Sequence, residues 1–227
     1  MGIKERQERD REAVRRSILD AARELFVSEG FQNVSIRKIA ERIEYSPAAI
    51  YSYFAGKDDI FFALAEEGFR LLCNGGRTPD EWHQLTPYQQ VRRRFERLYE
   101  FSREHPEYFA LMFLERSVPR ISKEYERFAF MREMRRQILS ELQACIDEGD
   151  LPKGLEPSVA MRTLTVGLLG IAHLRMSDRL APGEDADSLA ADVLDVVLAG
   201  LKSGVALRSK AVADCPLEET AVKKQAS

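Results

Sequence analysis

Apolar residues recur at helical spacing along almost the whole chain, and this period constrains the fold more than any other feature. No convincing run alternates apolar and polar residues between hairpin turns, as a half-buried strand would. The clearest stripe lies near the N-terminus and comprises Val14, Ile18, Leu19, Ala22, Leu25 and Phe26. The sequence therefore predicts an all-α protein with about nine helices.

Start and stop signals divide the first 60 residues into three helices. Gly30 can end the first, because glycine adopts a left-handed cap without strain. Ser35 can cap a second, short helix, whose apolar face begins at Ile36. Ser46 followed by Pro47 is the start signal of a third helix, which begins only three residues after the second helix ends. Two short helices at this spacing predict a helix-turn-helix.

The rest of the chain reads as a second helical unit. A longer fourth helix has Asp58 and Asp59 in its first turn and ends at the turn-rich segment 74–79, where we expect a boundary. Further helices are expected from Pro87, from Pro106, over about 122–148, from Pro157, and after Pro182-Gly183. We predict one unit over residues 1–60, a second over 61–204, and a flexible tail over 205–227.

Composition limits the classes of partner. The chain has 227 residues, of which 44% are hydrophobic and 31% charged, a balance that argues against disorder. Its 34 Lys and Arg against 37 Asp and Glu give a net charge of −3, so the chain is not a bulk polycation. Any contact with nucleic acid must therefore be confined to a small face. Such a face is compatible with residues 1–58, whose 11 basic and 10 acidic residues balance at +1.

The sequence shows neither an export signal nor the marks of an enzyme. The charged N-terminus lacks the apolar stretch of a signal peptide, and the apolar segment 163–174 is too short to span a membrane. Three scattered cysteines favour a reducing compartment, so we expect a soluble, cytoplasmic protein. No nucleophile elbow, Walker loop or HExxH pattern occurs, and the histidines at 83, 105 and 173 do not cluster. We therefore expect no catalytic residue, no metal and no cofactor.

Three stretches resemble the N-terminal domain of TetR/AcrR-family transcriptional regulators. They read FQNVSIRKIA over residues 31–40, SPAAIYSYF over 46–54 and KDDI over 57–60. The resemblance implies a homodimer that binds a palindromic operator in double-stranded DNA, usually as a repressor released by a small molecule. It makes residues 1–60 the DNA-binding domain and 61–204 the effector-binding and dimerisation domain.

The resemblance also indicates which side chains meet DNA. Ala48 and Ala49 stand at the base-facing start of the recognition helix, where they can specify bases only through apolar contact, such as with a thymine methyl group. Tyr53 could equally be a core aromatic, and Lys57 an ordinary exposed residue. The predicted contacts are Ser35, Arg37, Lys38, Ser46, Pro47, Ala48, Ala49, Tyr51, Ser52, Tyr53 and Lys57.

Two features of the N-terminal unit stay open. The family usually has a glycine where this sequence has Glu44, so the turn either accepts a side chain there or takes a different backbone course. The basic residues Lys4, Arg6, Arg9 and Arg11 could form an arm that reaches into a groove. The acidic residues between them favour a solvated, frayed start instead.

The second unit offers a predicted dimer interface and a predicted pocket. Residues 164–172 are apolar all round, which indicates burial on more than one side. The family resemblance implies that this segment and the last helix form a four-helix bundle with the partner, through Leu164, Gly167, Leu168, Gly170, Ile171, Leu189, Val193, Val196, Val197 and Gly200. Aromatic and Met residues at helical spacing more often form a closed core than a pocket. A pocket is expected around Phe69, Tyr99, Phe109, Met112, Phe113, Phe128, Met131 and His173.

Together with these patterns, the resemblance implies a homodimeric repressor released from its operator by a small, largely apolar ligand of unknown identity. The alternative is a TetR-like regulator or adaptor controlled by a partner protein.

Overall fold

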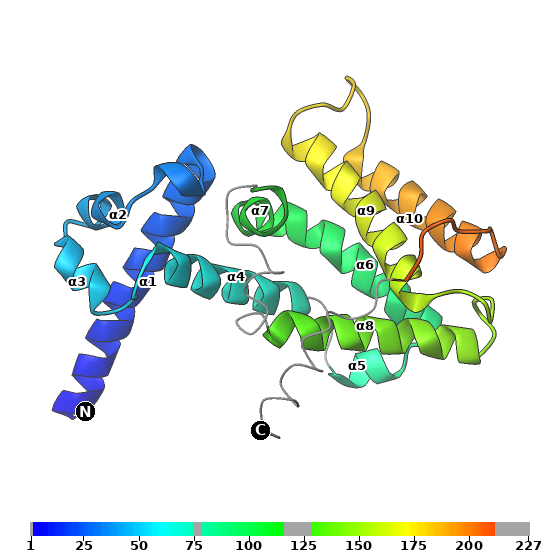
Figure 1. Ribbon diagram of the computed structural model, residues 1–227, viewed down its shortest axis with the longest axis horizontal. Coiled ribbons are helices and arrows are strands. Elements are labelled where there is room, and N and C mark those ends of the chain that lie inside the picture. The colour runs from blue at the N-terminus through cyan, green and yellow to red at the C-terminus, as the bar shows by residue number, and fades with distance from the viewer. Residues whose placement is uncertain (1, 75–78, 116–128, 212–227) are drawn as a thin grey trace, which may run out of the picture.

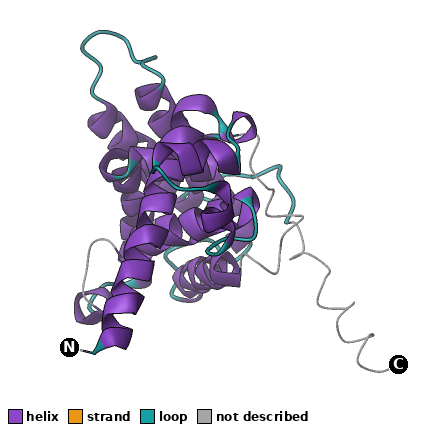
Figure 2. Cartoon of the chain, turned by 90° about the vertical axis from the view of Figure 1, so that its left-hand side faces the viewer, coloured by secondary structure: helices purple, strands orange, loops and turns teal. Residues whose placement is uncertain are grey.

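A computed structural model describes residues 2–74, 79–115 and 129–211, and this part of the chain is built of helices without strands (Figures 1 and 2). The all-α prediction is confirmed. The elements in order are α1 (Ile3–Glu29), the 3-10 turn η1 (Phe31–Asn33), α2 (Ile36–Arg42), α3 (Pro47–Tyr51), α4 (Lys57–Asn74), α5 (Pro79–His83), α6 (Pro87–Glu104), α7 (Pro106–Phe109), the π-helical segment η2 (Ala110–Leu114), α8 (Ala129–Asp147), α9 (Pro157–Met176) and α10 (Ala186–Lys202).

The first three helices share a small core. Ile18 of α1, Ile39 of α2 and Ile50 of α3 are completely buried, as the apolar spacing predicts. The turn η1 adds Phe31, whose ring lies 5.0 Å from that of Phe26, measured between ring centroids. The two short helices are therefore fixed on α1 by apolar packing, and their opposite faces stay exposed.

Helix α4 joins the two parts of the molecule. Its first turns bury Ile60 and Phe61, and the Phe61 ring meets Phe31 of the N-terminal unit at 5.7 Å. Its later turns bury Phe69 against Phe113 of η2. Figure 1 shows α4 running from the α1–α3 group to the α6–α8 group. The boundary predicted at residue 60 therefore falls within a continuous helix rather than in a linker.

The second part is a helical bundle with α6 at its centre. Helix α6 packs against α8, α9 and α10, and α9 packs along α10. Its core includes Phe101, Phe109 and Leu142, which are fully buried. An ion pair of Arg94 with Glu141 ties α6 to α8 at the rim of this core.

Helix boundaries differ from the prediction in two places. The described residues hold ten α-helices rather than about nine, because Pro79, taken as the end of a boundary, opens the short helix α5. The helix expected from residue 122 begins at Ala129 in the described part, and residues 122–128 lie outside it. Of the predicted tail, 205–211 are exposed and non-helical, and 212–227 lie outside the described residues. No described helix is both long and apolar enough to cross a membrane.

Candidate nucleic-acid interface

The predicted helix starts at Ser35 and Ser46 are both present. The Ser35 hydroxyl accepts the backbone N–H of Lys38 at 3.2 Å, and the Ser46 hydroxyl accepts that of Ala49 at 3.2 Å. Each serine satisfies one of the N–H groups that a helix leaves unpaired at its start. Local sequence therefore sets where both helices start.

The turn between α2 and α3 keeps a left-handed residue at Glu44. Its φ is +59°, in the region that favours glycine, and the backbone N–H of Tyr45 closes the turn on the Ala40 carbonyl at 2.9 Å. A side chain in this conformation costs roughly 1–2 kcal/mol. The chain thus accepts the side chain rather than changing the course of the turn, and it holds an exposed carboxylate there.

Most of the predicted contacts on α2, on α3 and at their caps are exposed. Tyr51 is 56% exposed, Ala49 is half-buried, and Ser35, Arg37, Ser46, Pro47, Ala48 and Ser52 are exposed. Sequence reasoning missed Tyr45, which is 44% exposed directly before the Ser46 cap. The sequence does hold a signal for Tyr45, because an aromatic residue in a turn belongs to no apolar helix face that would bury it. Small side chains flanked by two exposed tyrosines leave the start of α3 accessible to a groove.

Arg37 and Lys38 of α2 differ in the carboxylate that each one pairs with. Arg37 is 80% exposed, and its Nε donates to Glu41 Oε1 at 2.8 Å, which raises the pKa of Arg37. That bond fixes a planar group suited to phosphate or to the edge of guanine. Lys38 instead forms an ion pair with Glu29 of α1.

Lys57 and Tyr53, both predicted to contact phosphates, already interact with other residues of this chain. Lys57 Nζ donates to the Phe31 carbonyl at 2.7 Å and lies 4.2 Å from the centre of the Phe31 ring, and burial lowers its pKa. In this structure Lys57 fastens η1 to α4. Tyr53 is half-buried, and the Arg11 guanidinium lies 5.7 Å from its ring centre.

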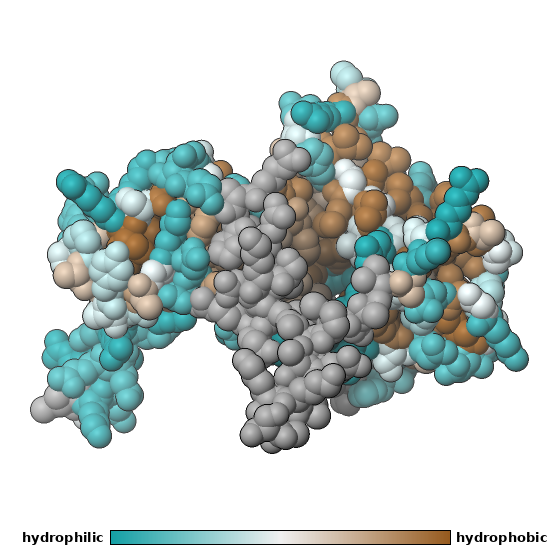
Figure 3. All heavy atoms as spheres, viewed as in Figure 1, coloured by the Kyte–Doolittle hydropathy of each residue, from teal (hydrophilic) through white to brown (hydrophobic). Residues whose placement is uncertain are grey.

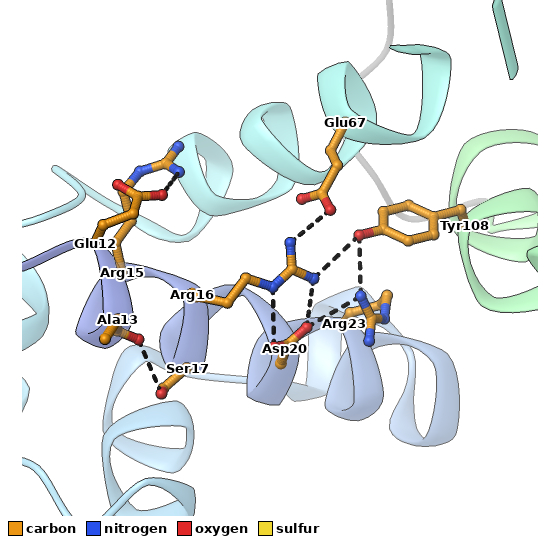
Figure 4. A network of polar contacts seen from close by, with 9 residues as sticks. All are labelled: Glu12, Ala13, Arg15, Arg16, Ser17, Asp20, Arg23, Glu67 and Tyr108. Atoms are coloured by element: carbon orange, nitrogen blue, oxygen red, sulfur yellow. Dashed lines mark hydrogen bonds and ion pairs between the residues drawn. The ribbon is translucent and has the colours of Figure 1, made fainter. Parts of the chain in front are cut away.

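A polar network joins α1 to the second part of the molecule (Figure 4). Tyr108 of α7 is buried, and its hydroxyl accepts from Arg23 at 2.9 Å and from Arg16 at 3.5 Å. Arg16 also donates to Asp20 of α1 and to Glu67 of α4, each at 2.5 Å. The hydrogen bond from Arg16 is the main cause of the lowered pKa of Asp20. Three helices therefore meet at one buried hydroxyl. A polar cavity of about 300 Å³ between α1 and α4, partly lined by Arg16 and Glu67, lies beside it.

The segment 106–114 packs on both parts at once. A Cβ built on Gly68 of α4 would lie 3.0 Å from Tyr108 Cδ1 and closer still to the Met112 sulfur, so this glycine permits the close approach. On the same segment, Phe109 and Phe113 lie 5.0 Å apart and pack among the aromatic rings of the second part. The same short segment therefore carries Tyr108 and two rings of the second part's aromatic core.

Only some of the predicted pocket residues come together. Phe69 lies 6.0 Å from Phe113 and 5.3 Å from Phe130, a residue that the prediction omitted. Met112 and Met131 are half-buried against the core. The Tyr99 hydroxyl donates to Asp187 of α10 at 2.8 Å, His173 is exposed on α9 and does not fit an enclosed pocket, and Phe128 lies outside the described residues.

The predicted dimer residues divide between the inside and the outside of the chain. Leu164, Leu168 and Ile171 are buried within it, and a Cβ on Gly167 would lie 2.8 Å from Val193, so these positions hold α9 against α10. Leu189, Val197 and Gly200 are half-buried. The exposed positions are Gly170 and Val196, to which the structure adds Val166, overlooked at 62% exposure. Figure 3 shows apolar residues gathered over α9 and α10.

Two short capped helices with an open polar side, carried on a helical second domain, define a helix-turn-helix DNA-binding regulator. The family description "Bacterial regulatory proteins, tetR family" matches residues 18–64, and "Tetracyclin repressor-like, C-terminal domain" matches residues 92–197. The chain belongs to the tetR family. These regulators bind DNA and are not enzymes, as the sequence predicts. Within the described residues, no group of three His, Cys, Asp or Glu is placed to hold a metal.

Curated relatives match only a short stretch of the chain. The HTH-type transcriptional repressor Rv1474c of Mycobacterium tuberculosis is 44% identical over 55 residues, which are 24% of this chain and 29% of that protein. AcnR of Corynebacterium diphtheriae, another HTH-type transcriptional repressor, is 36% identical over 53 residues, or 23% and 28% of the two chains. The match therefore spans less than a third of either relative.

Solved structures extend the likeness to most of the chain. The transcriptional regulator FadR from Bacillus subtilis, in complex with stearoyl-CoA, has a TM-score of 0.64 at 17% identity and covers 81% of this chain and 97% of its own. The fatty acid degradation regulator FadR from Bacillus halodurans has a TM-score of 0.66 at 17% identity and covers 82% and 94%. At this identity the likeness shows the fold.

Proposed function

We propose that this protein is a cytoplasmic homodimeric repressor that binds a palindromic DNA operator and is released from it by a small, largely apolar ligand. The observation that carries the proposal is α3, capped by Ser46, with Pro47, Ala48 and Tyr51 exposed along its open side. A helix of this form fits the major groove, and the exposed Arg37 of α2 lies in the same motif.

Dimerisation is supported by the outer surface of α9 and α10. Val166, Gly170 and Val196 are exposed there, and Gly170 has no atom of the neighbouring elements within 4 Å of its Cβ position. Two copies joined at this surface bury apolar area that water otherwise covers. Their two-fold symmetry matches that of a palindromic operator, whose half-sites lie about 34–36 Å apart.

An apolar ligand is supported by the aromatic rings of the second part. Phe69, Phe109 and Phe113 pack on one another next to the segment that carries Tyr108, so a ligand that displaced them would also disturb α1. A structural relative binds stearoyl-CoA, which makes this thioester the first probe to use. The ligand acts by favouring a dimer whose recognition helices no longer match the operator.

A mobility shift with the DNA upstream of its own gene tests the proposal. We expect a specific complex that competitor DNA of unrelated sequence does not remove, and partial release of the complex by stearoyl-CoA. Absence of any specific complex would overturn the DNA-binding role. A stable complex that a panel of acyl thioesters and other apolar metabolites leaves intact would instead favour control by a partner protein.

A further inference from the structure

The first turns of α1 project beyond the helix-turn-helix. Helix α1 begins at Ile3, residues 4–13 are exposed, and Ile18 is the first fully buried residue. The backbone N–H of Gly2 donates to Glu5 Oε2 at 3.0 Å and so caps the first turn. Figure 1 shows this end passing α3, and Figure 3 shows it as a hydrophilic projection. The start of the chain is therefore helical from Ile3 onward.

One side of this projection continues the side of α1 that carries α2 and α3. Lys4, Gln7 and Arg11 are three and four residues apart, which aligns them along the helix, and Ile18 follows Arg11 after two turns. The Arg11 guanidinium lies 5.7 Å from the ring centre of Tyr53, immediately after α3. The row therefore lies on the side of α1 that packs against the helix-turn-helix, and its last member, Arg11, touches Tyr53.

Two of the carboxylates near Lys4, Gln7 and Arg11 already have partners within α1 or at its cap. Glu5 accepts the N–H of Gly2, and Glu12 pairs with Arg15 at 3.4 Å. Glu8 lies between Lys4 and Arg11 in sequence and reduces the net positive charge of the row without removing it. Basic residues in such a row suit a phosphate backbone, and they adjoin the surface already proposed to meet DNA.

We propose that Lys4, Gln7 and Arg11 form an extension of the DNA interface and contact backbone phosphates just outside each half-site. The inference rests on the proposed function. From Lys4 to Arg11 the helix rises about 10 Å, which matches about three base pairs of duplex. Arg11 stacks on Tyr53 and presents its guanidinium edge to phosphate, and Lys4 reaches the next phosphates outward.

Adding a charge to the row gives the sharpest test. Gln7→Lys places a lysine within the row, and Ala13→Lys places one on the opposite side of α1 with the same net charge. We expect Gln7→Lys to tighten binding several-fold and to steepen the plot of log K against log salt by about 0.9 per new phosphate contact. Ala13→Lys should leave the slope unchanged. A gain in affinity also excludes misfolding as its cause.

Removing charge completes the test. Lys4→Ala with Arg11→Ala should weaken binding at least tenfold and flatten the salt slope, and Arg6→Ala, on another side of the helix, should do neither. All variants are measured on a duplex with natural flanks and on one trimmed to the half-sites, where the differences should shrink.

The outcomes separate the two proposals. Specific binding with equal slopes for Gln7→Lys and Ala13→Lys on the long duplex overturns this inference alone. A wild-type protein that binds no DNA specifically overturns the proposed function and this inference with it.

Discussion

Two surfaces remain exposed after the chain has built its own core, and they differ in chemistry. On α3 and its caps the exposed residues include the small or polar Ser46, Ala48 and Ser52 and the aromatic Tyr51. On α9 and α10 they include Val166 and Val196, with no side chain at Gly170. A polar face with short side chains suits phosphates and base edges. An apolar face gains about 25 cal/mol per Å² only when another apolar face covers it. Each surface therefore specifies the chemistry of its own partner.

The largest expected effect comes from placing a charge on the apolar surface. In Gly170→Glu the two copies bring like charges together in a desolvated interface, which costs several kcal/mol. We expect the dimer dissociation constant to rise at least 100-fold and operator binding to be lost with it, as measured by sedimentation and mobility shift. Helix content should stay unchanged, because the Cβ at this position meets nothing in its own chain.

A second glycine provides the contrast. Gly167→Ala forces Val193 aside, since the new Cβ would lie 2.8 Å from it, and so destabilises the monomer. Gly170→Ala should leave assembly nearly unchanged and raise the free energy of unfolding by about 0.5–1 kcal/mol, because alanine is favoured over glycine inside an exposed helix. If Gly170→Glu remained a dimer in sedimentation, the surface on α9 and α10 would have to be covered by something other than a second copy.

The polar surface should respond in specificity rather than in assembly. Arg37→Ala removes an exposed guanidinium that Glu41 holds in place. We expect operator affinity to fall 10- to 100-fold, equivalent to about 1–3 kcal/mol, and base preference to relax at one position per half-site, as measured by selection from random sequences. Lys38→Ala is the control, because Lys38 pairs with Glu29 and should alter affinity only slightly. An unchanged selection profile for Arg37→Ala would remove this residue from the readout.

The contrast between the two surfaces also explains what sequence could predict. Caps at Ser35 and Ser46 were predicted because they depend on residues three positions apart. Gly167 and Gly170 look alike in sequence, yet Gly167 packs against α10 and Gly170 faces open space. Which glycine is covered depends on how α9 and α10 cross, and no local pattern gives that.

The network around Tyr108 could not be predicted for a related reason. It joins residues 85 and 92 positions apart, and no local pattern signals such a meeting. The aromatic residues of the second part were assigned by type alone, so the prediction included the exposed His173 and missed Phe130.

Between the two surfaces lies Tyr108, and its hydroxyl tests whether they communicate. Tyr108→Phe removes the acceptor of Arg23 and Arg16 while keeping the ring. Hydrogen bonds to charged groups contribute about 1.5–3 kcal/mol, so we expect the free energy of unfolding to fall by about 1–2 kcal/mol in urea titrations. Release from DNA by stearoyl-CoA should need several-fold more ligand. If release were unchanged at equal DNA affinity, signals would have to pass through α4 alone.

The smallest effect separates two consequences of Glu44. Glu44→Gly relieves a left-handed residue and should raise the free energy of unfolding by up to about 1 kcal/mol, because part of the relief is lost to the flexibility of glycine in the unfolded chain. It also removes a carboxylate beside the DNA surface and should tighten binding a few-fold at low salt. Glu44→Gln removes the charge but keeps the backbone conformation, so it should tighten binding without raising stability. Equal stability of the glycine and glutamine variants would mean that the strain in this turn is no larger than the entropic cost of glycine. Neither change should alter the dimer dissociation constant if the two surfaces are independent.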